Sequence, residues 1–461
     1  MRCTPRSGTV LQLASLATPI MRKSGGGGGV QRALATGDKA VKLAGRLQLF
    51  AIIGPGLLVA ATGIGAGDLA TAAFTGSRVG TAVLWAVVLG AFLKFVLNEG
   101  LARWQLATGQ TLLEGAVGKF GFVVAAVFGP YFLVWSFLVA LALMSACGVT
   151  MHALVPVFSD AADAKIAFGV LHGAAGVVLV LLGGFRLFER VMSFLIVVMF
   201  LTVVVTAGML WPGTTEVLQG LIFPAPATLC GESLAWTIAL MGGVGGTVTV
   251  LCYGYWIREK GREGGGDLRI CRIDLGVAYA MTAVFGICMV IIGSTLTLPD
   301  KRGAGLIVEL AAQLEGPLGP VGKWAFLIGA WGAVFSSLLG VWQAIPYLFT
   351  DLWVLLHRRF REGSGEATNR RDYTRSRPYR AYLLALAIVP VYWLTMSFST
   401  VQKAYAITGA VFIPLLAVTL LVLNGRRGWV DDRFRNRRLT TIILLLATAF
   451  SAWLLFKAIF T

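Results

Sequence analysis

Apolar stretches separated by short polar or basic segments recur along the chain from residue 47 to residue 459. A membrane-crossing helix needs about 20 predominantly apolar residues. The pattern therefore predicts an all-α membrane protein with eleven transmembrane helices, at residues 47–74, 82–106, 122–154, 166–183, 191–210, 234–256, 273–298, 324–349, 381–398, 404–423 and 439–459. The fifth helix is predicted to follow the fourth almost directly, through Phe185–Arg190.

Two of these stretches are interrupted by glycines. In the first, GPGLLVAATGIGAGDLATAA at Gly54–Ala73, alternating glycines are followed by Asp68. In the sixth, MGGVGGTVTVLCYGYW at Met241–Trp256, four glycines precede Thr247 and Thr249. Each glycine weakens a helix by about 1 kcal/mol relative to alanine, so both helices are predicted to be broken. A carboxylate is costly in lipid unless it faces protein, water or an ion, which makes Asp68 a candidate binding residue.

The broken stretches are the first and the sixth, which divides the chain into two halves of five helices and one extra helix. Broken helices at corresponding places of two halves point to a transport site near the bilayer midplane, and five crossings per half make the second half an inverted copy of the first. We predict a flexible basic tail at residues 1–46, a first repeat at 47–210, a second repeat at 211–424, and a loop with the eleventh helix at 425–461.

Composition supports a membrane protein, because 57% of the residues are hydrophobic and only 13% are charged. The net charge of +17 comes from basic residues between the apolar stretches, with no nucleic-acid-binding motif. If the amino terminus is cytoplasmic, the cytoplasmic regions hold 31 of the 39 Lys and Arg residues and the outer regions hold 7. The bias predicts a multi-pass protein of the plasma (inner) membrane, with its amino terminus in the cytoplasm and its carboxyl terminus outside.

The second predicted helix carries Lys94 near its middle, with Asn98 and Glu99 about one turn further on. One interpretation is structural: the Lys94 side chain snorkels toward the membrane surface or pairs with Glu99. The other is a fixed cation that stands in for a coupling ion or interacts with Asp68. Glu99 and Arg103 are spaced i, i+4, which predicts a structural ion pair between them.

Five segments together resemble the natural resistance-associated macrophage protein (NRAMP) family. They are the glycine-rich first stretch, the following GTAVLW at Gly80–Trp85, GFRLFERVMSFL at 184–195, GGTVTV in the sixth stretch and RIDLGVAYA at the start of the seventh. The resemblance covers most of residues 47–424. It implies a proton-coupled divalent metal transporter with eleven or twelve helices in the inverted-repeat fold of the LeuT type.

The candidate metal site departs from the family pattern. The family's Asp-Pro-Gly-Asn signature aligns with residues 65–68, which replaces the metal-binding aspartate by Gly65 and the asparagine by Asp68. The family's Ala-Thr-Val-Met-Pro-His-Asn aligns with residues 246–252, so Thr249 stands in place of the methionine and Leu251 in place of the histidine. Acids that the family uses for proton passage align with Ser145 and Gly148.

These observations predict an alternating-access transporter of a divalent cation. A carboxylate, a hydroxyl and released carbonyls favour hard ions, whereas the family's thioether favours soft ones. Gly65, Asp68, Gly246 and Thr249 are the predicted substrate-binding residues, with Asp68 and Thr249 as metal ligands. The candidate coupling or pathway residues are Lys94, Asn98, Thr247 and Cys252.

The alternative is a transporter of a small organic or anionic solute on the same fold, with the substrate held by released backbone N–H groups. No phosphate loop, hydrolytic triad or redox motif is present, so an enzyme is not expected. No cofactor is predicted; the divalent metal ion is the expected substrate, and protons are its expected coupling ion. The expected partners are the lipid bilayer and a small ion or solute.

Overall fold

The computed structural model describes residues 55–56, 59, 67–295, 306–362 and 373–460, and these residues form helices joined by short loops. Its α-helices are α3 (Ala72–Val79), α4 (Leu84–Thr108), α5 (Leu112–Phe120), α6 (Gly129–Leu154), α7 (Ala161–Met209), α8 (Thr214–Ile222), α9 (Gly231–Gly243), α10 (Cys252–Glu259), α11 (Leu268–Ser294), α12 (Leu306–Glu362), α13 (Arg377–Ile388), α14 (Phe398–Ala410), α15 (Phe412–Leu423) and α16 (Arg438–Phe460). A five-residue π-helix, η1 (Gly67–Thr71), precedes α3, and a short 3-10 helix, η5 (Val248–Leu251), precedes α10. The all-helical prediction is therefore confirmed.

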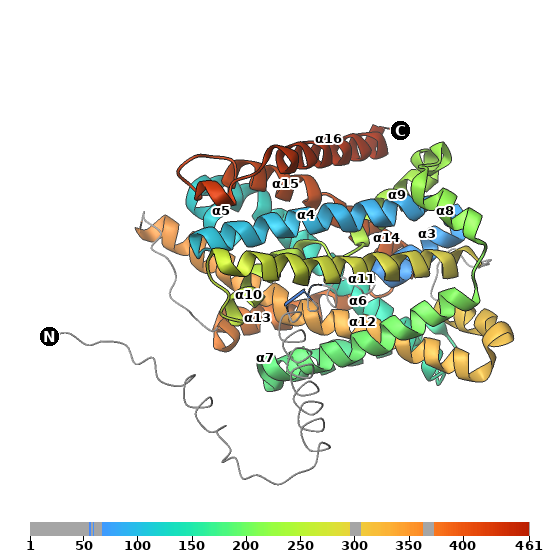
Figure 1. Cartoon of the computed structure of the whole chain (residues 1–461). Helices are drawn as coiled ribbons and strands as arrows, with labels where there is room; N and C mark the ends of the chain where they lie inside the picture. Colours follow the sequence, from blue (N-terminus) through green and yellow to red (C-terminus); the bar gives the residue numbers. More distant parts are fainter. Residues whose placement is uncertain (1–54, 57–58, 60–66, 296–305, 363–372, 461) are drawn as a thin grey trace, which may run out of the picture. The chain divides into compact units, whose positions relative to one another are not determined.

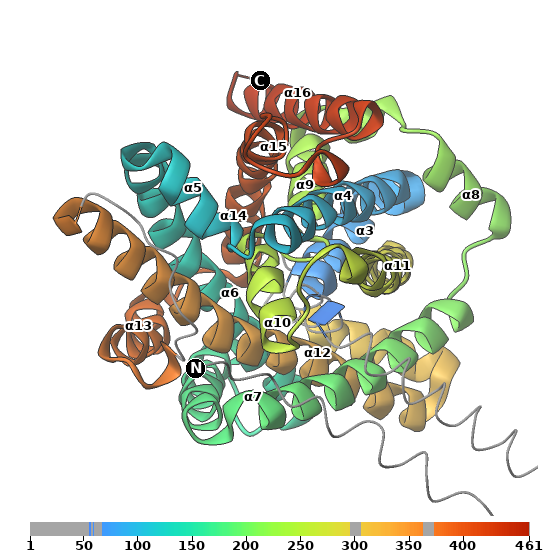
Figure 2. The same ribbon diagram turned by 60° about the vertical axis from the view of Figure 1, so that its left-hand side comes forward.

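The long helices lie alongside one another in a bundle (Figure 1). Helix α12 packs against α6 and α7, α11 packs against α3 and α4, and α14 packs against α9. Figure 2 shows α10 in the middle of the bundle, with α4 on one side and α12 on the other. Because the apolar core is shared by helices far apart in sequence, residues of the first and second halves meet at its centre.

Close contact between α3 and α11 depends on glycine. A Cβ atom on Gly76 would lie 2.3 Å from the carbonyl oxygen of Val290, and one on Gly293 would lie 2.3 Å from the carbonyl oxygen of Ala73. Small residues allow helix backbones to approach closely in membranes, where packing rather than water exclusion drives association. These two glycines therefore fix α3, and the η1 segment just before it, against α11.

Within the described residues, seven helical stretches are long and apolar enough to cross a membrane, and a bent pair at Phe200–Met209 and Thr214–Ile222, with an angle of 119°, would make eight. The seven lie at Asp68–Thr108, Val124–Leu154, Ala161–Leu182, Gly231–Glu259, Gly265–Ser294, Gly319–Arg358 and Phe398–Leu423. A protein that crosses the membrane several times is thus confirmed for the described residues. The count of eleven stays a prediction.

The connection between the predicted fourth and fifth spans is helical. The backbone continues as α7 through Phe185–Arg190, so both predicted spans lie within this element. The sequence there, FRLFER, contains residues that favour helix and no proline. Glycines just before it weaken a helix without ending one. The 49 residues of α7 are enough for two membrane crossings of about 20 residues each.

Candidate functional site

The helix that begins as α9 is interrupted at its centre. Helix α9 ends at Gly243, α10 begins at Cys252, and Gly245 and Gly246 between them have φ values of 73° and 80°. Residues with a Cβ rarely adopt such left-handed conformations, so glycine is needed at both positions. The interruption releases backbone N–H and C=O groups that a continuous helix would pair internally. Gly246 thus contributes to the site through its backbone geometry.

Asp68 lies in η1 and faces this interruption. Its side chain is fully buried, and its Oδ2 atom accepts a hydrogen bond from the backbone N–H of Gly245 at 3.2 Å. Its Oδ1 atom has no hydrogen-bond partner among the described residues. The two glycine-rich stretches therefore meet in space. A buried carboxylate oxygen without a donor costs free energy unless something else pairs with it.

Lys94 reaches the same interruption from α4. Its buried ammonium donates hydrogen bonds to the carbonyl oxygens of Gly242, at 2.7 Å, and Val244, and its charge acts on Asp68. The Glu99 carboxylate is instead held by Arg103 at 2.7 Å and by Arg272 at 2.8 Å. The predicted Glu99–Arg103 pair is confirmed, and the interpretation of Lys94 as the partner of Glu99 is wrong.

Several polar groups surround the charged pair. Asn98, one turn after Lys94, donates from Nδ2 to the hydroxyl of Tyr279 at 3.0 Å, and its Oδ1 atom has no partner among the described residues. Thr247 lies beside the hydroxyl of Tyr405. Both tyrosines interact electrostatically with Asp68, and sequence reasoning named neither. Tyr279 lies within the family-like stretch RIDLGVAYA, which was the available signal; nothing in the sequence marks Tyr405.

Within the described part of the chain, no hydrogen bond to Asp68 is observed for the remaining predicted residues. Thr249 is buried in η5. The Cys252 thiol contacts the carbonyl oxygen of Ala344 at 3.7 Å and so packs against α12. Gly65 lies outside the described residues. Among the described residues, no group of three or more His, Cys, Asp or Glu side chains could hold a metal ion, so an ion here would rely on one carboxylate, hydroxyls and carbonyls.

A second buried acid, Asp274, ties together three segments near the start of α11. Its carboxylate accepts from the Gly56 backbone N–H at 2.9 Å, the Tyr253 hydroxyl at 3.0 Å and the Arg262 guanidinium at 3.0 Å. We call these four residues the Asp274 network. A Cβ atom on Gly56 would lie 2.4 Å from Asp274 Oδ1, which explains why glycine stands there. The network joins the start of the first stretch to α10 and α11.

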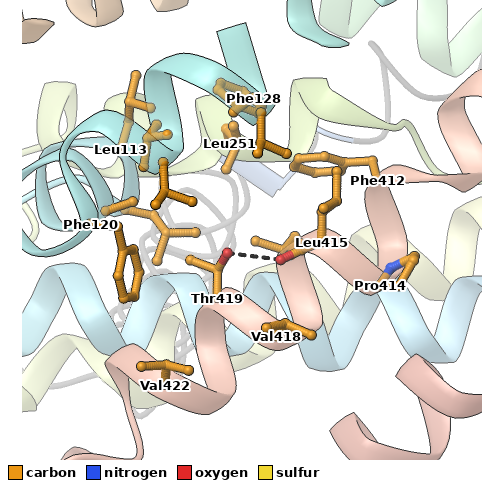
Figure 3. A pocket seen from close by; sticks show the side chains of 16 residues that line it. Leu113, Phe120, Phe128, Leu251, Phe412, Pro414, Leu415, Val418, Thr419 and Val422 are labelled. Carbon is orange, nitrogen blue, oxygen red and sulfur yellow. Dashed lines mark hydrogen bonds between the residues drawn. The ribbon is translucent and has the colours of Figure 1, made fainter. Parts of the chain in front are cut away.

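A large cavity is lined by neither acid. It has a volume of about 410 Å³ and is bounded by apolar side chains of α5, the following π-helix at Val124–Phe128, and α15 (Figure 3). Its one hydroxyl group, on Thr419, donates to the carbonyl oxygen of Leu415 within its own helix. A cavity without free polar groups cannot replace the hydration shell of an ion. The candidate substrate site is therefore the polar interruption around Asp68.

A helical membrane bundle whose interrupted helix faces a buried acid defines a membrane transporter rather than an enzyme. Residues 56–461 match the family described as natural resistance-associated macrophage protein-like, and the chain belongs to this NRAMP family.

Similar proteins agree with this assignment. The divalent metal cation transporter MntH 1 of Pseudomonas aeruginosa is 26% identical over 434 residues, which cover 90% of each chain. A manganese transporter variant from Eremococcus coleocola has a similar fold, with a TM-score of 0.67, 16% identity, and coverage of 88% of this chain and 85% of that one. MhsT in complex with L-phenylalanine also matches, with a TM-score of 0.57, 15% identity, and coverage of 87% and 98%. Because the fold is shared with a protein that holds an amino acid, the fold alone does not define the substrate.

Proposed function

We propose that this protein is an alternating-access secondary transporter of a divalent metal cation, with Asp68 as its charged ligand. The observation that carries the proposal is the buried Asp68 carboxylate, which has one oxygen bonded to Gly245 and one without a partner among the described residues. A cation placed at that oxygen would satisfy it, and unwound carbonyls of a broken helix are the usual additional ligands in such transporters. Membership of the NRAMP family and similarity to a divalent metal cation transporter support the same class of substrate.

We further propose a preference for hard cations such as Mg²⁺ or Ca²⁺. Asp68, Thr249 and carbonyls near Gly65 and Gly246 supply oxygen ligands, and oxygen suits hard ions that keep part of their hydration. No thioether stands in the interrupted helix between Gly243 and Cys252. Thr247 and Asn98 lie beside the site and are proposed to line the pathway, with Cys252 at the start of α10 as its next position.

The proposal also includes the arrangement of the helices in two repeats and their orientation in the membrane. It comprises two inverted repeats of five helices at residues 47–210 and 211–424, followed by an eleventh helix, with the amino terminus in the cytoplasm and the carboxyl terminus outside the plasma membrane. The glycines around Gly245, the packed start of α11 and the bias of basic residues support it. Reporter fusions after Asn424 and after Thr461 should give opposite signals; equal signals would contradict the eleven-helix topology.

The test of the transport function is ion uptake into vesicles that contain the purified protein. When uptake of labelled Mn²⁺ is measured, unlabelled Mg²⁺ or Ca²⁺ should compete at least as well as unlabelled Mn²⁺ does, and Cd²⁺ should compete poorly. Thermal-shift measurements with the same ions should show stabilisation, because a ligand that binds only the folded state raises its stability. Absence of any divalent-ion binding or uptake would overturn the proposal.

A second candidate function is transport of a small organic solute, and Lys94 is the observation that favours it. Its ammonium already donates hydrogen bonds to two carbonyl oxygens of the interrupted helix. Together, Lys94 and Asp68 give the site one positive and one negative charge, which suits a zwitterion. The same thermal-shift screen, run with amino acids, separates the two functions: stabilisation by amino acids without stabilisation by divalent ions would favour the organic solute.

A further inference from the structure

We infer that Lys94 is a tethered cation that occupies part of the ion site and sets the affinity of the site for divalent ions. This inference rests on the proposed function, because it concerns the same site around Asp68. Its basis is the pair of hydrogen bonds that the buried Lys94 ammonium makes to the carbonyl oxygens of Gly242 and Val244.

The backbone explains why these two oxygens are available. In a continuous helix the carbonyl of each residue accepts from the N–H four residues later. The partners would be Gly246 and Val248, but the left-handed conformations of Gly245 and Gly246 interrupt the helix just there. Lys94 supplies the missing donors. A cation that entered the site would need the same oxygens.

Helix packing directs Lys94 to this place. A Cβ atom on Gly90, one turn before Lys94 on α4, would lie 3.3 Å from the carbonyl oxygen of Met241. The absence of a side chain there lets α4 approach the end of α9 closely. Residues four apart share one face of a helix, so Lys94 projects from the same face toward the interruption. Its position is therefore fixed by the contact between the helices.

The charges of the site lead to the functional consequence. With Asp68 ionised and Lys94 protonated, the pair carries no net charge, and a divalent ion would add two positive charges beside an ammonium in a region poor in water. Like charges repel strongly in such a medium. Lys94 must therefore leave the Gly242 and Val244 carbonyls before the ion can use them. The lysine acts as a built-in competitor that weakens ion binding, so a bound ion leaves the site more readily.

The experiment compares Lys94→Met with Lys94→Arg. Methionine has a similar length without the charge, so the site becomes negative and its two carbonyls become free. The affinity for Mn²⁺ and for Mg²⁺, measured by isothermal titration calorimetry at fixed pH and ionic strength, should increase at least tenfold. Arginine keeps the positive charge, and its affinity should be equal to or weaker than that of the unaltered protein.

Lys165→Met is the matched control. Lys165 on α7 is also buried, and its ammonium donates to a backbone carbonyl, that of Met396 at 2.6 Å, which is not part of the interrupted helix. Its loss should leave the ion affinity unchanged. Lys94→Gln, which keeps one donor for the freed carbonyls, serves as a second neutral variant if Lys94→Met does not fold, and it should also bind ions more tightly.

The outcomes separate this inference from the proposed function. Tighter binding in the neutral variants, with none in Lys94→Arg, supports the tethered cation, because a loss of structure would not increase affinity. Equal or weaker binding in the neutral variants, while the unaltered protein binds ions, overturns the inference and leaves the transport function standing. Absence of ion binding in the unaltered protein and in all variants overturns both.

Discussion

Asp68 and Asp274 are both completely buried acids in apolar helices, yet their surroundings are opposite. The Asp274 carboxylate receives hydrogen bonds from a backbone N–H, a tyrosine hydroxyl and a guanidinium, which also balances its charge. The Asp68 carboxylate receives one hydrogen bond, from Gly245, and its other oxygen has no partner among the described residues. Burial alone therefore does not distinguish a structural acid from a binding acid.

The difference between the two acids indicates their roles. A buried charge that is fully paired stabilises a particular arrangement of segments, and its removal leaves the partners unpaired. A buried charge that is only partly paired is costly in the empty protein and gains most from an added ligand. We therefore interpret Asp274 as a residue that holds the start of the first stretch against α10 and α11, and Asp68 as the ligand-binding residue.

The largest effect is expected at Asp68. Asp68→Asn keeps the size of the side chain and removes its charge, and the loss of one partner of a buried charge interaction costs about 3–5 kcal/mol. Ion uptake in vesicles should fall at least about a hundredfold, since 1.4 kcal/mol is tenfold in binding. The variant should remain folded and inserted, and an added Gly65→Asp should restore part of the ion binding. Normal uptake by Asp68→Asn would contradict the role of this residue and favour the organic solute.

Asp274→Asn should mainly lower stability. The substitution leaves the Arg262 guanidinium without its buried counter-charge, and we expect a loss of about 3 kcal/mol in the free energy of unfolding. Thermal unfolding in detergent measures this loss, and the ion affinity of the folded fraction should change little. If Asp274→Asn instead abolished ion binding without lowering stability, the two acids would have similar roles and the comparison would fail.

Gly245→Ala tests the backbone that serves Asp68. At a φ of 73°, a Cβ atom would lie 3.0 Å from the ring of Tyr279, and the strained conformation alone costs about 1–3 kcal/mol. Stability and ion affinity should both decrease, because the N–H of Gly245 donates to Asp68. Gly276→Ala in α11 is the control: a Cβ atom there meets nothing within 4 Å, so stability should be equal or slightly higher. Equal behaviour of the two variants would contradict the strain.

The smallest effect is expected at Thr249, which makes no hydrogen bond to Asp68 among the described residues. Thr249→Met introduces a soft thioether ligand near an oxygen-lined site, which should shift competition in favour of Cd²⁺ over Mg²⁺ by roughly tenfold, about 1.4 kcal/mol. Competition uptake measures the shift. Strong Cd²⁺ competition in the unaltered protein, or none in Thr249→Met, would place Thr249 outside the ligand shell.

Much of the fold follows from the sequence, because local patterns encode it. Apolar length predicts membrane helices, and seven of them are observed within the described residues. The glycines near Gly245 predict weak helix, and the backbone is interrupted there. Family membership was also recognisable from short motifs. The helical conformation of the segment between the fourth and fifth spans did not follow from the sequence, since FRLFER is polar enough for a loop but also favours helix, and only the surrounding structure selects between the two.

The site was only partly predictable. Asp68 and Lys94 stood out because a charge in an apolar stretch is costly anywhere, whatever surrounds it. The partners of these charges depend on helices that are distant in sequence: Lys94 meets carbonyls about 150 residues later, and Tyr405 lies beside Thr247. Asp274 shows the same limit, because its pairing with Gly56 spans 218 residues. Sequence thus determined which residues needed partners, and helix packing decided which partners they found, since only the tertiary fold brings those helices within hydrogen-bonding distance.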